Sequence, residues 1–238
     1  MREDKRFAVL IDADNVSEKY IKLIFDEISN DGVVTYKRIY GDWTKPTLST
    51  WKTSLLRYSI TPIQQYSYTT GRNSTDSALI IDAMDILYSG NVEGFCLVSS
   101  DSDFTRLAAR LRESGMYVIG MGEKKTPQPF VVACNKFKYL EALAKSEAED
   151  GPLEAVVTKP EIVKDAIRRI VDETSDEDGW TPLSDIGNTL IKRFPDFDVR
   201  NYGFVKLTPF IKWLKSFEIK SVKTNNENIK LIYIKNKE

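Results

Sequence analysis

Short apolar runs alternate with amphipathic helical patterns over the first 140 residues, and this alternation restricts the fold more than any other feature. Strand-like apolar runs lie at residues 7–11, 33–40, 61–66, 95–98 and 116–121, and helical patterns lie between them at residues 17–29, 46–58, 76–87 and 104–113. The third helix is the clearest, because Leu79, Ala83 and Leu87 recur on one helix face. This order predicts an α/β domain whose mainly parallel sheet is covered by helices on both faces.

The sequence changes in character after this region. Residues 144–152 are polar and acidic and end in Gly-Pro, which is typical of an interdomain linker. Three helical patterns then predict helices at residues 160–171, 183–194 and 205–217, and two alternating strand-like runs flank the turn-forming residues 225–228. Three helices and a terminal hairpin predict a small winged-helix domain. We therefore expect domains at residues 1–142 and 159–238, joined by a linker at residues 143–158.

The net charge of −1 conceals an uneven distribution of charge. Residues 1–141 carry 18 Lys or Arg and 18 Asp or Glu. Residues 160–199 carry five basic and ten acidic residues, whereas residues 200–238 carry nine basic and three acidic ones. The basic end of the chain suits an anionic partner such as RNA, although a solvated charged face is the alternative.

Some classes of protein are excluded by composition. The chain contains no histidine, so catalytic triads and zinc motifs that need imidazole are absent. Cys96 and Cys134 lie in apolar segments without partners at metal-ligand spacing, and we expect buried thiols. No apolar run approaches the roughly 18 residues of a membrane-spanning helix, and the first residues are too charged for a secretory leader. We expect a cytoplasmic protein with no membrane partner. Its oligomeric state stays open, with a homodimer as one alternative.

Four aspartates stand where predicted strands end or predicted helices begin. Asp12 ends the first strand and Asp101 follows the fourth. In a doubly wound sheet whose order begins 3-2-1-4, these strands are neighbours and their carboxyl ends meet. Asp76 lies one turn before the apolar stripe of the third helix and should point toward the sheet, whereas Asp103 begins the helix after the fourth strand. Stabilisation of a helix dipole is the alternative role for Asp76 and Asp103.

Carboxylates gathered in one pocket raise one another's pKa, so such a pocket favours a bound cation. A site made only of aspartates favours Mg²⁺ or Mn²⁺ over zinc. Such an ion can activate water and stabilise the leaving oxygen of a phosphodiester. The four aspartates therefore predict metal-dependent transfer of a phosphoryl group to water.

Three motifs carry a resemblance to a known family. The segments LIDADN at residues 10–15, STDSALIIDAMD at residues 74–85 and VSSDSDF at residues 98–104 resemble, in this order, the NYN domain of the PIN-like nuclease superfamily. The resemblance implies a PIN-like, Rossmann-like sheet and endoribonucleolytic cleavage with Mg²⁺ or Mn²⁺. It also implies five catalytic residues: Asp12, Asn15, Asp76, Asp101 and Asp103. The four aspartates would be metal ligands, and Asn15 would be a polar residue beside the metal.

A second resemblance covers the end of the chain. The segments WTPLSDIG at residues 180–187 and YGFVKLTPFI at residues 202–211 are similar to the OST-HTH/LOTUS module, an RNA-binding winged helix. The pairing of the two modules resembles that in uncharacterised bacterial NYN proteins. The implied function is a ribonuclease to which the winged helix recruits RNA.

Other residues beside the motifs could contact the substrate. Arg72 precedes the third helix and could bind a phosphate, with an exposed loop arginine as the alternative. Ser99 and Ser100 could orient a ligand carboxylate or a water, or could only satisfy the backbone of the turn. Lys124 and Lys125 follow the fifth strand and either line the approach of RNA or are surface charge. We expect Arg72, Ser100, Lys124 and Lys125 to bind substrate.

Two other functions remain as alternatives. A phosphatase of the haloacid dehalogenase type would use Asp12 as nucleophile and Asp14 as general acid, but it gives Asp76 no role. A non-catalytic RNA-binding adaptor would keep the fold and lack turnover. Asp82 and Asp85, later on the third helix, are interpreted as solvated positions.

Overall fold

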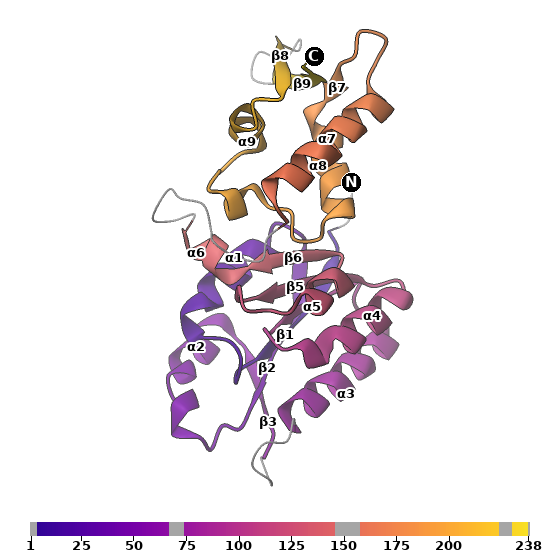
Figure 1. Cartoon of the computed structure of the whole chain (residues 1–238). Helices are drawn as coiled ribbons and strands as arrows, with labels where there is room; N and C mark the ends of the chain where they lie inside the picture. Colours follow the sequence, from indigo (N-terminus) through magenta and orange to yellow (C-terminus); the bar gives the residue numbers. More distant parts are fainter. Residues whose placement is uncertain (1–3, 67–73, 146–157, 224–229, 238) are drawn as a thin grey trace. The chain divides into compact units, whose positions relative to one another are not determined.

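The chain divides into two compact units, residues 1–144 and residues 145–238. The computed structural model describes residues 4–66, 74–145, 158–223 and 230–237, which are drawn in colour in Figure 1. The first unit is an α/β domain, and the second is helical with a small antiparallel sheet. The predicted fold class is confirmed for both units.

The first unit is built on a six-stranded parallel sheet with the order β3-β2-β1-β4-β5-β6. The predicted neighbourhood of the first and fourth strands is therefore correct, whereas the sixth strand was not predicted. The strands are β1 (Arg6–Asp12), β2 (Val33–Gly41), β3 (Thr61–Gln64), β4 (Gly94–Val98), β5 (Tyr117–Gly122) and β6 (Lys136–Tyr139).

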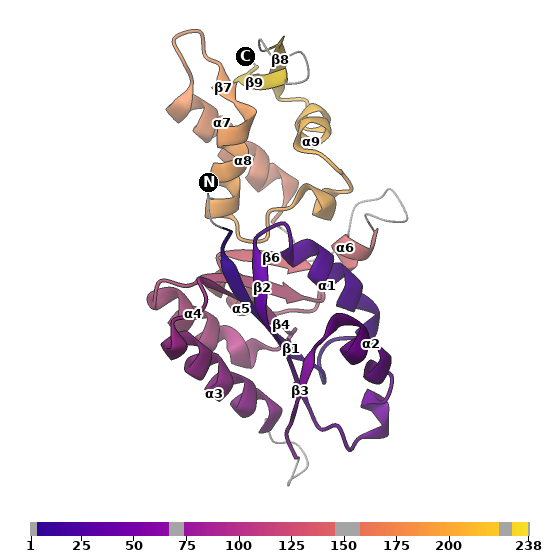
Figure 2. The same ribbon diagram turned by 180° about the vertical axis from the view of Figure 1, so that it is seen from behind.

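Helices cover both faces of this sheet (Figures 1 and 2). One face carries α1 (Ile21–Ile28), α2 (Trp51–Tyr58) and α6 (Leu140–Lys145), and the other carries α3 (Ser74–Ser89), α4 (Thr105–Glu113) and α5 (Gln128–Ala133). Short 3-10 turns precede three of these helices: η1 (Glu18–Tyr20), η2 (Pro46–Leu48) and η3 (Ser102–Phe104). Strand β1 is buried on both sides because alternate residues face opposite helix layers, so Ile11 packs on the α1 side and Asp12 points to the α3 side.

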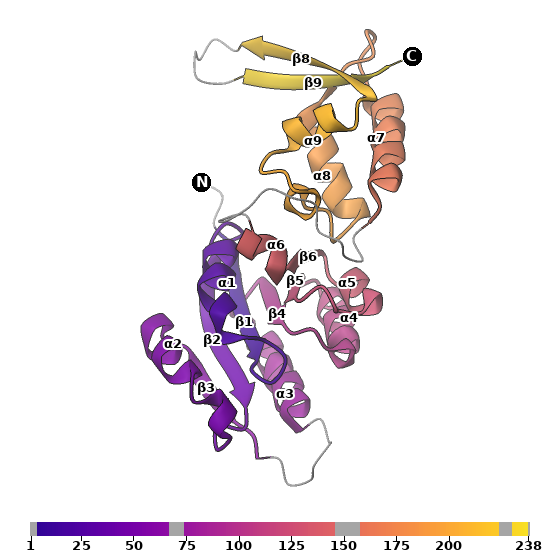
Figure 3. The ribbon, with the colours of Figure 1, turned by 60° about the vertical axis from the view of Figure 1, so that its left-hand side comes forward.

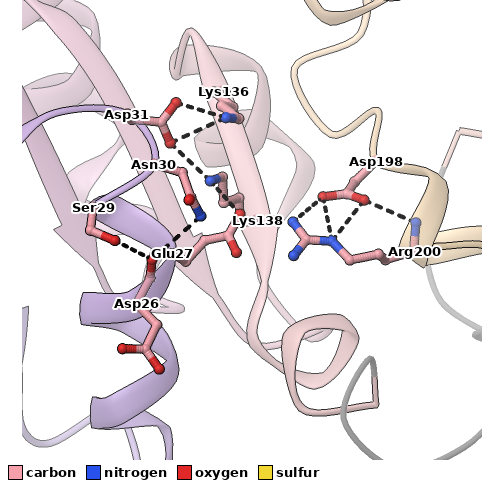
Figure 4. A network of polar contacts seen from close by, with 9 residues as sticks. All are labelled: Asp26, Glu27, Ser29, Asn30, Asp31, Lys136, Lys138, Asp198 and Arg200. Atoms are coloured by element: carbon pink, nitrogen blue, oxygen red, sulfur yellow. Dashed lines mark hydrogen bonds and ion pairs between the residues drawn. The ribbon is translucent and has the colours of Figure 1, made fainter. Parts of the chain in front are cut away.

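Strand β6 is short and carries two lysines within a buried network of ion pairs (Figure 4). The Nζ atom of Lys138, whose side chain is 2% exposed, lies 2.6 Å from Glu27 Oε1 and 2.9 Å from Asp31 Oδ2. Lys136 Nζ lies 2.9 Å from the other oxygen of Asp31. Burial opposes the charge on Lys138, but the carboxylates of Asp31 and Glu27 outweigh burial and raise its pKa. The strand was missed because an alternating Lys-Phe-Lys-Tyr sequence does not reveal that Lys138 is buried and Lys136 partly buried.

The second unit packs the helices α7, α8 and α9 against a three-stranded sheet with the order β7-β9-β8. Figure 3 shows these helices and the neighbouring strands β8 and β9. The elements of this unit are α7 (Pro160–Thr174), β7 (Thr181–Pro182), α8 (Leu183–Arg193), η4 (Val199–Tyr202), α9 (Leu207–Trp213), β8 (Phe217–Lys223) and β9 (Lys230–Asn236). Strands β8 and β9 form the predicted antiparallel pair, while residues 225–228 lie outside the described residues. The prediction of one helix over residues 205–217 was wrong at its end. Lys215 has a left-handed backbone with φ 56°, and Phe217 already begins β8.

Both cysteines are free and fully buried, as the sequence predicts. Burial raises the pKa of the Cys96 thiol to about 12, and it also raises the pKa of Cys134. Within the described ranges, the structure contains no helix with the length and apolar character that crossing a membrane requires.

Candidate metal centre

Asp12 lies at the carboxyl end of β1, beside its register partner Tyr40 on β2. Its side chain is completely buried. The carboxylate accepts hydrogen bonds from Asn15 Nδ2 and Ser99 Oγ, both at 2.8 Å, and from the backbone N–H of Asp14 at 3.1 Å. Burial raises the pKa of Asp12, although these three donors oppose the change. The donors fix the orientation of a carboxylate that the fold has removed from solvent.

The turn after β4 supplies the next acids through a chain of short contacts. Ser99 Oγ, which donates to Asp12, also accepts a hydrogen bond from the backbone N–H of Asp101 at 3.1 Å. The carboxylate of Asp101 in turn accepts from the backbone N–H of Asp103 at 2.9 Å and caps η3. The turn therefore ties the ends of β1 and β4 together.

Asp76 reaches the same place from the first turn of α3. One carboxylate oxygen from each of Asp76, Asp101 and Asp103 lies within 4.8 Å of the others. Asp76 is buried, Asp101 is partly buried and Asp103 is exposed, so the group opens toward solvent on one side. The structure thus brings together the acids for which helix capping was the alternative role. Capping and membership of the cluster coexist in Asp101, whose carboxylate accepts a hydrogen bond from the backbone N–H of Asp103.

The electrostatics of the cluster show strong repulsion. Burial raises the pKa of Asp76 to about 6, and the negative charges of Asp12, Asp101, Asp103 and Asp14 add to the effect. A carboxyl group whose pKa is raised this far carries a negative charge that the surrounding protein compensates poorly. A divalent cation fits this donor set, because hard ions prefer oxygen ligands and would neutralise the repulsion. The aspartate cluster is consistent with the metal site of NYN and PIN nucleases.

The residues expected to bind substrate have varied surroundings. Ser100 Oγ accepts a hydrogen bond from the backbone N–H of Glu123 at 2.8 Å. The backbone N–H of Lys124 donates to the carboxylate of Glu141, and Lys125 Nζ lies 3.0 Å from Glu123 Oε2. Ser100 Oγ and Lys125 Nζ thus both contact Glu123 of the same chain. The prediction for Arg72 lies outside the described residues.

The surroundings of Asp14 and Asp82 do not agree with the roles considered for them from the sequence. Asp14 Oδ1 lies 3.5 Å from Lys45 Nζ, so the general acid that the phosphatase alternative requires is engaged in an ion pair. Asp82 is not a solvated position, because its carboxylate contacts both Arg38 and Tyr40 on β2. Asp85 is exposed as expected. Helical spacing alone could not identify the partners of Asp82, which lie 44 and 42 residues earlier on the strand β2.

Similarity to known proteins agrees with the two units. Residues 6–141 match the NYN domain, and residues 158–229 match the OST-HTH/LOTUS domain. No curated protein matches the chain significantly.

Two solved structures are similar to parts of the chain. A protein of unknown function from Vibrio parahaemolyticus is 18% identical, with a TM-score of 0.50 over 58% of this chain and 94% of that one. At this identity the likeness concerns the fold alone. An uncharacterized protein from Nitrosomonas europaea is 30% identical over 38% of this chain and 83% of that one, with a TM-score of 0.29.

The match to the NYN domain covers more than half of the chain, and it spans the strand ends and the helix start that carry the acidic cluster. The second match covers the described helices and the first strand of the hairpin in the second unit. The chain therefore belongs to the NYN-domain family, a family of PIN-like nucleases, and carries an OST-HTH/LOTUS domain after its NYN domain.

Proposed function

We propose that the protein is an endoribonuclease that hydrolyses RNA phosphodiester bonds with Mg²⁺ or Mn²⁺. The observation that carries this proposal is the convergence of Asp76, Asp101 and Asp103 within 4.8 Å at the end of the sheet where Asp12 also lies. Two segments of the chain, the start of α3 and the turn after β4, contribute to this group, and Asp12 comes from a third segment, β1. The proposal gives each acid the same purpose, whereas the phosphatase alternative uses only Asp12 and Asp14.

The roles of the residues follow from their surroundings. Asp12, Asp76, Asp101 and Asp103 would hold the ion. When bound, it would polarise the phosphodiester and stabilise negative charge on the leaving oxygen. Asn15 fits a supporting role, because its amide donates to Asp12 and sets the direction in which that carboxylate points.

The second unit offers a surface suited to single-stranded RNA. Around α9, Val205 and Trp213 are 74% and 51% exposed, and the exposed lysines Lys206, Lys212 and Lys215 lie within two residues of one or the other in the sequence. Aromatic rings on which bases stack, together with lysines along the phosphate backbone, are the usual means of binding single strands. This surface supports recruitment of RNA by the OST-HTH/LOTUS domain. Contacts of RNA with Arg72, Ser100, Lys124 and Lys125, and a cytoplasmic location, stay predictions.

The test compares cleavage of single-stranded and structured RNA by the wild type, Asp12→Asn and Asp101→Asn in Mn²⁺. We expect each substitution to lower kcat by more than about 100-fold, because loss of a ligand should exceed the usual effect of losing a residue that supports one. Asp85→Asn is the matched control, since Asp85 is an exposed acid on α3, and it should cleave like the wild type. Equal cleavage by all four proteins would disprove the nuclease.

RNA binding by the same four proteins separates the nuclease from the adaptor alternative. A nuclease should retain RNA affinity in Asp12→Asn while losing turnover. Binding without cleavage by the wild type, in Mg²⁺ and in Mn²⁺, would instead support a non-catalytic adaptor. A filter-binding titration at fixed salt measures this affinity, since salt alone changes it strongly.

A further inference from the structure

Asp82 joins α3 to the sheet through two residues of β2. Arg38 and Tyr40 are two residues apart on this strand, so their side chains leave the same face. The guanidinium of Arg38 donates to Oδ1 of Asp82, and the hydroxyl of Tyr40 donates to Oδ2. Both carboxylate oxygens of Asp82 are thus held by one strand.

These contacts lie next to the candidate metal centre on both sides. Tyr40 is the register partner of Asp12, at the carboxyl end of β1. Asp82 follows Asp76 by six residues on α3, which corresponds to about 9 Å along the helix axis. A continuous path therefore runs from Asp12 across the sheet to Tyr40, through the hydrogen bond to Asp82, and along α3 to Asp76.

The hydrogen bonds that Asp82 accepts are largely shielded from solvent and should be stronger than exposed ones. The side chains of Arg38 and Asp82 are 29% and 20% exposed, and Tyr40 is completely buried. Burial raises the pKa of Tyr40, and the hydrogen bond to Asp82 raises it further, which keeps its hydroxyl proton in place as a donor. Charge-assisted hydrogen bonds shielded from water hold their geometry better than exposed ion pairs. The ion pair of Arg6 and Glu93, with 49% and 44% exposure, is of the exposed type.

A restraint on α3 is needed because the acids repel one another. One carboxylate oxygen from each of Asp76, Asp101 and Asp103 lies within 4.8 Å of the others, so like charges at this spacing push the start of α3 away from the end of β4. A carboxylate fixed to β2 opposes that movement. Asp85, one turn further along α3, is exposed and is not positioned for this purpose.

We propose that Asp82, clamped by Arg38 and Tyr40, is a positioning residue that sets the place of Asp76 in the metal centre. This inference rests on the proposed function. Asp82 itself binds neither the ion nor the RNA. Its effect reaches the site only through the position of α3.

The test measures the affinity of the full-length protein for Mn²⁺, by electron paramagnetic resonance of the free ion, together with kcat and KM for RNA. Asp82→Ala should weaken Mn²⁺ binding by about 10- to 100-fold and lower kcat, with KM nearly unchanged. Tyr40→Phe removes one of the two bonds and keeps the ring, so it should show a smaller loss of the same kind. Asp85→Ala, the matched control on the same helix, should bind Mn²⁺ within about twofold of the wild type.

The readouts distinguish positioning from simple stabilisation of the fold. If Asp82→Ala lowers the melting temperature but keeps wild-type Mn²⁺ affinity and kcat, the inference is overturned and the proposed nuclease stands. If Asp82→Ala does not fold, Tyr40→Phe decides by the same comparison. A wild type that neither binds Mn²⁺ nor cleaves RNA overturns the proposed function, and the inference with it.

Discussion

Two groups of acids in the first unit differ in how the protein compensates their charge. Glu27 and Asp31 meet the ammonium groups of Lys136 and Lys138, and these lysines lower the pKa of Asp31 despite its burial. In the aspartate cluster the pKa of Asp76 moves in the opposite direction, to about 6. The first group is neutralised by the chain itself. The second retains charge that an ion from solution can neutralise.

The difference separates a stabilising network from a candidate site. Buried charges that are paired and hydrogen-bonded keep their ordinary ionisation and hold elements together. Buried charges that repel one another lower stability, and the fold retains them where they bind something. Both groups are acidic and partly buried, so burial and acidity alone would not have distinguished them. The position of the neighbouring lysines distinguishes the two groups.

The largest change in the free energy of unfolding should come from Lys138→Met. The substitution removes the ammonium that Glu27 and Asp31 share, and it leaves both carboxylates in a poorly hydrated place where Lys136 pairs with Asp31. We expect a loss of about 3 kcal/mol in the free energy of unfolding, measured by urea denaturation at pH 7. Lys22→Met is the matched control. Its ion pair with Asp26 is exposed, and its loss should cost less than about 0.5 kcal/mol. A cost for Lys138→Met as small as that of the control would show that the network does not hold the fold.

Mn²⁺ should stabilise the aspartate cluster by a similar amount. At a concentration 100 times the dissociation constant, a ligand that binds only the folded state adds about 2.7 kcal/mol to the free energy of unfolding. We expect this increase in the wild type and in Asp85→Asn, and none in Asp101→Asn. Urea denaturation with and without the ion measures it. The same stabilisation in Asp101→Asn would place the ion elsewhere in the protein.

The smallest effect should come from Asp76→Asn without metal. Because the pKa of Asp76 is raised from 3.8 to about 6, the folded state binds more protons than the unfolded state between these values. The contribution of Asp76 to stability therefore falls as pH rises from about 4 to 6. Asp76→Asn should remove this fall and be more stable than the wild type by about 1 kcal/mol at pH 7, since solvent screens part of the repulsion.

The expected order reverses when Mn²⁺ is added, because the substituted protein gains little from the ion. Urea denaturation of both proteins at pH 4, 5, 6 and 7 checks the prediction. Parallel pH dependences of the two proteins would contradict it. They would mean that the fold already compensates the charge of Asp76.

The proximity of Asp76, Asp101 and Asp103 could be predicted from the sequence because the information is local. Asp12 ends a buried strand and Asp101 comes shortly after another, and the sheet order brings the ends of these two strands together. The partners of buried polar groups were not predictable in this way. Lys138 and Glu27 are 111 residues apart, and nothing near either one in the sequence indicates the other. Asp82 was interpreted as solvated for the same reason, since its burial depends on Arg38 and Tyr40.

Chemical labelling of the two buried thiols can measure how often the NYN domain opens. Cys96 lies on the central strand β4, and Cys134 lies between α5 and β6, with neither side chain exposed. Alkylating reagents react with exposed thiolates, and burial disfavours both exposure and ionisation here. Labelling of either cysteine in native buffer must therefore wait for the sheet to open. The rate of labelling consequently measures fluctuations of the NYN domain separately from those of the second unit, which contains no cysteine.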